Sequence, residues 1–449
     1  MHARSELAPV VEVEEDVYTY EPADNGADPL WCRSCTCLVR IGERLFASGL
    51  ETLSGAKPLN NVRWLLFEHT ADDWHLQRVA EEDRTREPCP LVGFPGGPLF
   101  LSANPTLVED PQHEGGGPAR PEILSFDPTD IGAPYQVILP RWDGEPSFTE
   151  HSYRSFTCDP SRREIILFQN VGYTHSEWAL RTGDGEWLTG KLVWPEREHT
   201  EIAPYDSTRA RCNYATVVLT DRAVHFCGAA AYNRWDRVRT MERAGREWGP
   251  RWRRLMYTWT PDIGSAEFSE WIEISNTFED GGWLFPGDLW VDEDGGAHIF
   301  WSEHAINERL RDSFFPDIKR RWALKYAVVR DGEITHRETL TEGGEGLSDL
   351  VTPSIGNPRL QVTPDRRLFI CYYVRGRDES GEQVSENRVM EILPDAGTSE
   401  PVTLPLQHPL TDFFTATPRG GSPPSRTLEM LGYRAGARQT VSYARVRLY

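Results

Sequence analysis

A self-similar unit of about sixty residues recurs along this chain of 449 residues and restricts the folds that it can adopt. Each unit opens with two strand-like runs joined by a turn, as in HSYRSFTCDPSRREIILFQNV, where Asp, Pro and Ser favour a tight turn. A third strand-like run follows, and often a fourth. Units start near residues 31, 88, 150, 210, 286, 356 and 413. Four short strands, repeated seven times, predict an all-β, seven-bladed β-propeller.

The two ends of the chain are predicted to complete one blade together. The last unit reaches the C-terminus after three strands, at TVSYARVRLY. The alternating run VVEVEEDVYTY, residues 10–20, can supply the missing outer strand and cover an edge that would otherwise be exposed. We therefore expect a single domain over residues 1–449, because no Pro/Ser-rich linker marks a boundary between two separate β domains.

Composition limits the partners of this protein. A hydrophobic content of 39%, with 16 Trp, 18 Phe and 15 Tyr, suits a large folded core. With 48 Lys and Arg against 69 Asp and Glu, the net charge of −21 disfavours nucleic acid and anionic membranes. No apolar run is long enough to span a membrane. The acidic N-terminal stretch lacks the apolar core of a signal peptide, so we expect a cytoplasmic protein or a mature secreted form.

The eight cysteines show no framework of regular pairs. Three of them fall in WCRSCTC, residues 31–37, where strand alternation would place Cys35 and Cys37 on one face and Cys32 on the other. We therefore expect no metal site there and no cofactor, although a structural ion in the central channel stays an open alternative.

His151 and His175 flank the hairpin of the third unit. Their midpoint, (151 + 175)/2 = 163, falls in the turn, so both histidines are expected at the open end of the hairpin. Neighbouring strands lie about 4.8 Å apart, which would allow the two imidazoles to share one ligand. The alternative is that one caps a strand and the other lies in a solvated loop.

Long insertions gather in one class of loop. In a propeller blade, the loop between the second and third strands lies at the same face as the start of the first strand. Five such loops are long: 51–61, 104–122, 231–251, 304–321 and 375–388. The turns between first and second strands stay short, so a binding site is predicted at the face with the long loops.

The loop of the fourth unit is basic. Residues 234–254 carry eight arginines and three acids, a charge of 8 − 3 = +5. Arginines such as Arg234 can hold a carboxylate or sulfate in bidentate fashion. A solvated helix with internal ion pairs is the alternative.

Arg211 and Tyr214 open the inner strand of the fourth unit, next to His151 of the third. Together with His175 and His304 they offer a base, an acid and a cation. That set suits proton abstraction beside a carboxylate, because the arginine stabilises the enolate-like charge. It suits binding alone equally well.

Two motifs resemble known propeller families. RTGDGEW (181–187), TADDWH (70–75) and DEDGGAHIFW (292–301) resemble the degenerate Asp-box, or BNR, repeats of the sialidase superfamily. Segment 151–214, with its opening His, THSEWALR and CNYATV, resembles propeller polysaccharide lyases that cleave ulvan-type, uronic-acid-containing polymers. In that family such a His pair and Tyr act as base, acid and substrate ligands, which implies these roles for His151, His175 and Tyr214.

The lyase resemblance implies β-elimination on an acidic oligo- or polysaccharide, with Arg211, Arg234 and His304 as expected substrate ligands. The family places an arginine on the partner strand soon after the tyrosine, whereas this chain has HFCGAAAYNRW there. Arg234 follows the family's arginine position in the sequence, and Arg211 precedes it.

Two other functions stay open. A sialidase-type exo-glycosidase would use an arginine cluster, for which Arg33, Arg211 and Arg359 are candidates, together with a Glu and Tyr pair that the sequence does not identify. A non-catalytic glycan- or protein-binding propeller needs no shared histidine site. We predict a carbohydrate-active propeller, with the lyase as the first hypothesis.

Overall fold

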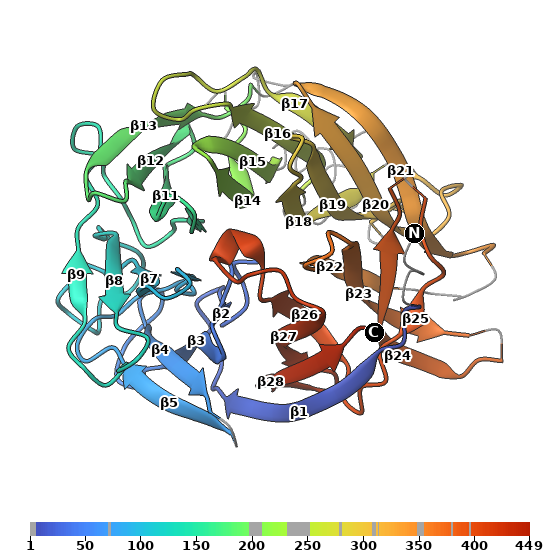
Figure 1. The fold of residues 1–449 in the computed structure, drawn as a ribbon, viewed down its shortest axis with the longest axis horizontal. Helices are drawn as coiled ribbons and strands as arrows, with labels where there is room; N and C mark the ends of the chain where they lie inside the picture. The colour runs from blue at the N-terminus through green and yellow to red at the C-terminus, as the bar shows by residue number, and fades with distance from the viewer. Residues whose placement is uncertain are drawn as a thin grey trace.

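The computed structural model describes residues 6–70, 73–196, 209–230, 252–277, 281–307, 311–312, 314–347, 354–378, 380–394 and 397–449. Seven four-stranded antiparallel sheets form a closed ring around a central axis (Figure 1). The predicted all-β, seven-bladed propeller is therefore confirmed. Among the described residues, no helix combines the length and the hydropathy needed to cross a bilayer.

We number the blades in chain order. The strands of blades 1 to 3 are β2 (Leu38–Ile41), β3 (Arg44–Thr52), β4 (Val62–His69) and β5 (Trp74–Val79); β6 (Leu91–Gly93), β7 (Leu99–Ala103), β8 (Glu122–Phe126) and β9 (Gln136–Ile138); and β10 (Ser155–Asp159), β11 (Glu164–Val171), β12 (His175–Arg181) and β13 (Trp187–Val193).

Blades 4 to 6 consist of β14 (Cys212–Thr220), β15 (Ala223–Ala230), β16 (Arg254–Thr260) and β17 (Ile272–Asn276); β18 (Trp283–Val291), β19 (Ala297–His304), β20 (Arg321–Arg330) and β21 (Glu333–Gly344); and β22 (Ser354–Val362), β23 (Leu368–Arg377), β24 (Gln383–Ile392) and β25 (Val402–Thr403). Blade 7 consists of β26 (Leu410–Thr415), β27 (Thr427–Arg434), β28 (Ala437–Arg447) and β1 (Val10–Thr19).

The N-terminal strand closes the ring, as predicted. β1 pairs antiparallel with β28 and forms the outer strand of blade 7. Tyr18 ties this strand to blade 1, because its ring stacks on Phe67 with a centroid distance of 4.8 Å and its hydroxyl accepts a hydrogen bond from the Leu50 amide at 3.1 Å. The first and last blades are thus joined by hydrogen bonds and by aromatic packing.

Hydrophobic side chains fill the space between neighbouring blades. For example, Phe168 of β11 packs on Phe226 of β15, with ring centroids 5.4 Å apart, inside a buried cluster that joins blades 3 and 4. The alternation of strand residues sends one row of side chains into each inter-blade layer, which explains why nearly every position of the inner strands is buried.

The central channel is occupied by protein. The connection between β26 and β27 folds inward as the short helix η2 (Pro418–Gly420), which lies near the centre of the ring (Figure 1). Arg419 of this helix forms an ion pair with Asp288 of β18 at 3.1 Å, and both side chains are buried. A ligand therefore has to bind at a mouth of the channel.

Three of the predicted long loops connect second and third strands as expected: β3 to β4, β7 to β8 and β19 to β20. Loop 231–251 lies outside the described residues. The segment 375–388 differs, because β23 continues to Arg377 and β24 begins at Gln383, so most of it is an extended hairpin instead of a loop.

Candidate functional site

Aromatic side chains from the starts of three inner strands form a continuous cluster at one mouth of the channel. His151 stacks on Tyr153 with ring centroids 4.6 Å apart, both just before β10. Tyr153 contacts Trp31, just before β2, at 4.9 Å and Tyr214 of β14 at 5.2 Å. The cluster thus brings together two predicted site residues, His151 and Tyr214, from blades 3 and 4.

Both tyrosines have a left-handed backbone conformation. φ is 41° at Tyr153 and 52° at Tyr214, values that a residue with a bulky side chain rarely adopts. Such a conformation costs about 1–3 kcal/mol and persists where surrounding contacts hold it, often at functional sites. At Tyr214 the strand also shifts register against β15, which turns the side chain away from the regular alternation.

A buried carboxylate holds the strained segment of blade 3. Glu87, just before β6, accepts hydrogen bonds from the backbone amides of Ser152 at 3.0 Å and Tyr153 at 3.1 Å, and from the Ser152 hydroxyl at 2.5 Å. Burial raises the pKa of Glu87, while Arg154 opposes that shift. Glu87 is therefore a positioning residue beneath His151 and Tyr153.

His151 has an unusual electrostatic environment. Its Nε2 atom is buried and forms no hydrogen bond within the part of the chain that the structure describes. Burial, together with the positive charges of Arg86 and Arg211, lowers the pKa of His151 to about 2. The imidazole is therefore neutral at neutral pH, with a nitrogen lone pair or N–H that a ligand can use.

The two tyrosines stay protonated across the physiological range. Burial raises the pKa of Tyr153 to about 12, and burial likewise raises the pKa of Tyr214 well above its ordinary value. Both phenols can therefore donate a proton or a hydrogen bond beside the neutral imidazole of His151.

Two arginines border the cluster. The Arg211 guanidinium lies 4.7 Å from the ring centroid of Tyr153 and 4.3 Å from that of Tyr173. Arg86 donates from Nε to the carbonyl of Asn25 at 3.0 Å. The Nε of Arg211 is buried and has no hydrogen-bond partner among the described residues, so it retains a donor for an anion. The Nη1 of Arg86 is also buried and lies 3.8 Å from the Glu87 carboxylate, so the charge of Arg86 is already paired within the protein.

His175 begins a different strand from the one that His151 precedes. The predicted hairpin of β10 and β11 is present, but His175 begins the third strand, β12, where it pairs with Val171. Both histidines therefore lie at the open end of the hairpin, with β11 between the segment that carries His151 and the strand that begins with His175. His175 contacts the Thr174 hydroxyl at 2.7 Å through Nδ1 and the buried carboxylate of Glu177 at 3.0 Å through Nε2.

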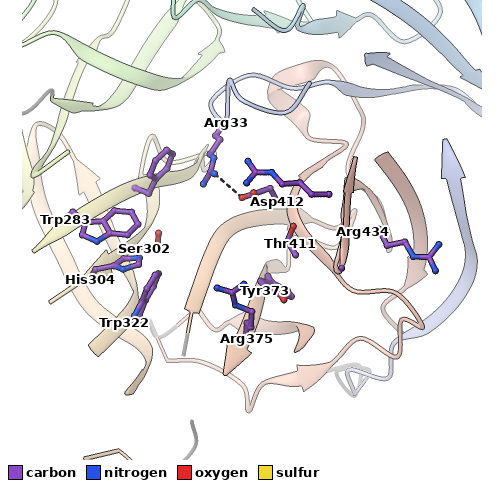
Figure 2. Close-up of a pocket in the computed structure, with 13 residues that line it drawn as sticks. Arg33, Trp283, Ser302, His304, Trp322, Tyr373, Arg375, Thr411, Asp412 and Arg434 are labelled. Atoms are coloured by element: carbon purple, nitrogen blue, oxygen red, sulfur yellow. Dashed lines mark ion pairs between the residues drawn. The ribbon is translucent and has the colours of Figure 1, made fainter. Parts of the chain in front are cut away.

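Arg33 and His304 line a separate cavity of about 370 Å³ between blades 5 and 7 (Figure 2). Arg33 forms an ion pair with Asp412 at 3.2 Å, and its guanidinium lies 4.4 Å from the ring centroid of Phe285. The ring of Phe285 contacts Tyr214 at 5.2 Å, so the cavity adjoins the aromatic cluster around His151. His304 is buried in the cavity wall, packed against Trp283.

Arg359 occupies a structural position in the channel. It is 2% exposed and donates to three backbone carbonyls, those of Phe413 at 2.8 Å, Gly287 at 2.7 Å and Arg33 at 2.7 Å. Burial lowers the pKa of Arg359 to about 10. Because these donors are engaged with the backbone, Arg359 is not a candidate ligand for a substrate, and we do not group it with Arg33 and Arg211 as one arginine cluster.

The predicted substrate ligand Arg234 lies outside the described residues.

Sequence analysis did not single out Trp31, Arg86, Glu87 and Tyr153. Tyr153 stands in the same motif as His151. Arg86 and Glu87 lie a few residues before the inner strand of blade 2, and Arg211 directly precedes that of blade 4. Position before an inner strand is therefore a signal that could have identified them.

The cysteine motif also differs from expectation. Residues 31–37 form turns before β2 instead of a strand, and the Cys35 amide donates to the Cys32 carbonyl at 3.1 Å. The sulfur atoms of Cys32 and Cys35 lie 3.4 Å apart, so the predicted placement on opposite faces is wrong. Within the described ranges, no three or more His, Cys, Asp and Glu side chains gather as a group that could hold a metal ion.

A histidine at the other end of blade 5 has a structural counterpart. His298 contacts Asp292 at 3.2 Å and the Tyr326 hydroxyl at 2.7 Å, an arrangement similar to a proton relay. In blade 4, His225 makes the same 2.7 Å contact with Tyr257 from the equivalent strands. Because the pair recurs between the second and third strands of two blades, we assign it to blade packing.

No family model matches this sequence, and no curated protein matches it. Among solved structures, it is similar to a protein of unknown function from Dyadobacter fermentans (11% identity, 98% of this chain and 99% of that chain, TM-score 0.45). It is also similar to a polysaccharide lyase, an ulvan lyase bound to a GlcA and Rha3S unit (9%, 97% and 95%, TM-score 0.47), and to the GH93 α-L-arabinofuranosidase of Fusarium graminearum (11%, 96% and 97%, TM-score 0.45). At this level of similarity, these likenesses carry no argument about activity.

Proposed function

We propose that this protein is a carbohydrate-active propeller that binds an acidic glycan at the channel mouth and cleaves it by β-elimination, as a polysaccharide lyase. The observation that carries the proposal is the environment of His151, whose buried and unpartnered Nε2 lies in a neutral imidazole influenced by Arg86 and Arg211. Base, acid and carboxylate-binding groups are the three elements that this reaction needs.

In this reaction, Arg211 would hold the carboxylate of a uronic acid and thereby acidify the C5 proton, with the charge of Arg86 close to the same site. His151 takes that proton, the C–H electrons form the C4=C5 double bond, and the C4–O bond breaks. A phenol, Tyr153 or Tyr214, gives its proton to the leaving oxygen. One product carries an unsaturated uronate and the other a free hydroxyl, and solvent returns the protons to the protein.

Substrate binding would also prepare the base. The charges of Arg86 and Arg211 contribute to the depressed pKa of His151 in the free protein. A bound carboxylate compensates those charges, so the part of the pKa depression that the arginines cause is removed and the imidazole becomes a better proton acceptor, while the larger effect of burial remains. An acidic glycan is thus favoured over a neutral one by the chemistry of the site itself.

His175 has a different place in this proposal. Its contacts with Thr174 and Glu177 place it beside the site, next to Tyr173, whose ring lies under Arg211. We therefore propose His175 as a residue that supports the β11–β12 turn and the position of Arg211, and assign the base to His151.

The test is an absorbance assay near 235 nm on a panel of uronic-acid polysaccharides, with wild type and His151→Ala compared. A rise in the wild type that the variant lacks supports the lyase. New reducing ends without that absorbance would indicate a hydrolase instead, and binding without any product would indicate a non-catalytic glycan-binding propeller.

A further inference from the structure

The cavity beside the aromatic cluster has one wall of rings and one wall of cations. Figure 2 shows Trp283, His304 and Trp322 on one side, and Arg33, Asp412, Tyr373 and Arg375 across from them. Its volume of about 370 Å³ lies within the range of small-molecule sites, which is about 300–1,000 Å³. Aromatic walls with a few convergent polar groups are typical of ligand pockets, and sugar rings stack on such walls through their C–H faces.

The side chains that line the cavity carry more positive than negative charge. Four arginines, Arg33, Arg375, Arg434 and Arg438, line the cavity together with one carboxylate, Asp412. Three of these arginines have acidic partners: Arg33 pairs with Asp412 at 3.2 Å, Arg434 with Asp16 at 3.3 Å and Arg438 with Asp28 at 3.2 Å. This set is basic although the chain as a whole carries a charge of −21.

Arg375 stands out from the other three. It lies near the end of β23, is exposed, and forms no ion pair with any carboxylate in the described part of the chain. Tyr373, two residues earlier and on the same face of the strand, is held by a 2.9 Å hydrogen bond between its hydroxyl and that of Ser385. A guanidinium without a carboxylate partner, opposite aromatic rings, suits an oxyanion carried by a sugar ring.

Phe285 links this cavity to the proposed cleavage site. Its ring contacts Tyr214 at 5.2 Å, and the Arg33 guanidinium lies 4.4 Å from its centroid. Tyr214 in turn contacts Tyr153, which carries His151 on its other face. A glycan chain that places one uronate beside His151 could therefore extend over Phe285 into the cavity.

We infer that this cavity is a second anion subsite, which binds a carboxylate or a sulfate ester on another sugar of the same glycan, with Arg375 as its principal ligand. The inference rests on the proposed function for the identity of the ligand as an acidic glycan. Beyond the proposed function, the protein then recognises a repeated pattern of anionic groups along the glycan. Its affinity for the glycan depends on an arginine that does not contact the reacting sugar.

The test measures binding separately from turnover. Binding is measured by isothermal titration calorimetry in the His151→Ala background, because this substitution prevents cleavage of the probe. The probes are chondroitin 4-sulfate hexasaccharide, its desulfated form and hexagalacturonate. The variant is Arg375→Gln, and the matched control is Arg377→Gln, which removes the same charge from the same strand outside the cavity lining.

We expect Arg375→Gln to weaken binding about 10- to 100-fold, as for the loss of a charge-assisted hydrogen bond, and Arg377→Gln to change it less than about two-fold. A loss restricted to the sulfated probe identifies a sulfate ester, and an equal loss with the desulfated and galacturonate probes identifies a carboxylate. Equal affinities of Arg375→Gln and Arg377→Gln for every probe, or no binding of any probe by the parent protein, would overturn the inference.

These outcomes are independent of the lyase test. If the wild type forms an unsaturated product and Arg375→Gln binds the probes with unchanged affinity, the subsite is refuted and the proposed function is supported. If Arg375→Gln binds the probes more weakly but the wild type forms no product, the inferred subsite is supported and the lyase proposal is refuted.

Discussion

The imidazole of His151 and the phenol of Tyr153 stack at 4.6 Å between ring centroids, although only one residue separates them in the sequence. Successive side chains of a regular strand alternate between faces, and residues two apart are usually too far apart for face-to-face packing. The φ of 41° at Tyr153 turns its ring toward His151 and makes the contact possible. A local backbone distortion thus brings together the two residues for which we propose the roles of base and acid.

His151→Ala should abolish turnover without affecting stability. General base catalysis contributes about 10²- to 10⁴-fold, so kcat on any cleaved polymer should fall by at least that factor. Because the imidazole lies at the channel mouth and its Nε2 has no described partner, we expect the melting temperature to change little. His75→Ala, on the exposed face of β5, is the control and should retain full activity. A large fall in melting temperature for His151→Ala would assign that residue a structural role.

Stability should depend on pH through His151. Its pKa is lowered in the folded state to about 2, so between about pH 6.5 and pH 2 the unfolded chain binds a proton that the folded protein does not. Stability contributed by the neutral imidazole is therefore lost as the pH falls below about 6.5. Relative to His151→Asn, the wild type should lose about 1.4 kcal/mol of unfolding free energy between about pH 7.5 and 5.5. Parallel urea titrations of both proteins measure this difference, and identical pH slopes would contradict it.

Glu87→Ala should destabilise the protein strongly. The carboxylate is buried, accepts three hydrogen bonds from residues 152–153 and lies 4.0 Å from the Arg154 guanidinium. Its removal leaves the buried charge of Arg154 without this carboxylate and the amides of Ser152 and Tyr153 without their acceptor, a loss of about 3–5 kcal/mol in unfolding free energy. Glu114→Ala, a carboxylate that is 81% exposed, should stay within about 0.5 kcal/mol of wild type. Chemical denaturation distinguishes the two, and equal midpoints would refute the positioning role of Glu87.

Tyr18→Ala should loosen the closure of the ring. The substitution removes the stacking on Phe67 and leaves the Leu50 amide without its acceptor, at a cost of about 2–4 kcal/mol. Val10→Ala changes the same strand at a position that is 44% exposed and should cost less than about 0.5 kcal/mol. Hydrogen exchange of the β28 amides should accelerate in Tyr18→Ala alone. Unchanged protection of β28 would show that the N-terminal strand does not depend on this tyrosine.

The blade pattern could be predicted from the sequence because it is local. Strand alternation, the turn residues of DPSRR and the repeat spacing are each contained within a single unit of the chain. The same reasoning placed β1 beside β28, because a unit that lacks its outer strand requires one from elsewhere. His175 was likewise predicted just after the second strand of its unit, and the structure has it as the first residue of β12.

Side-chain environment could not be predicted in the same way. Arg33 and Arg359 both stand near inner strands, yet Arg359 is buried against three carbonyls in the channel while Arg33 lies at a cavity with Asp412. The difference arises from the bulges of the inner strands and from η2, which bring together residues hundreds of positions apart.

The sequence by itself determined the all-β class, the seven-fold repeat and the closing N-terminal strand, because periodicity and turn chemistry act over short distances along the chain. It also singled out His151, Arg211 and Tyr214 as candidate positions. Only the tertiary structure decided that Tyr153, Arg86 and Glu87 surround His151. Burial, charge proximity and left-handed backbone at single residues depend on how neighbouring blades pack, and no pattern within one blade contains that information.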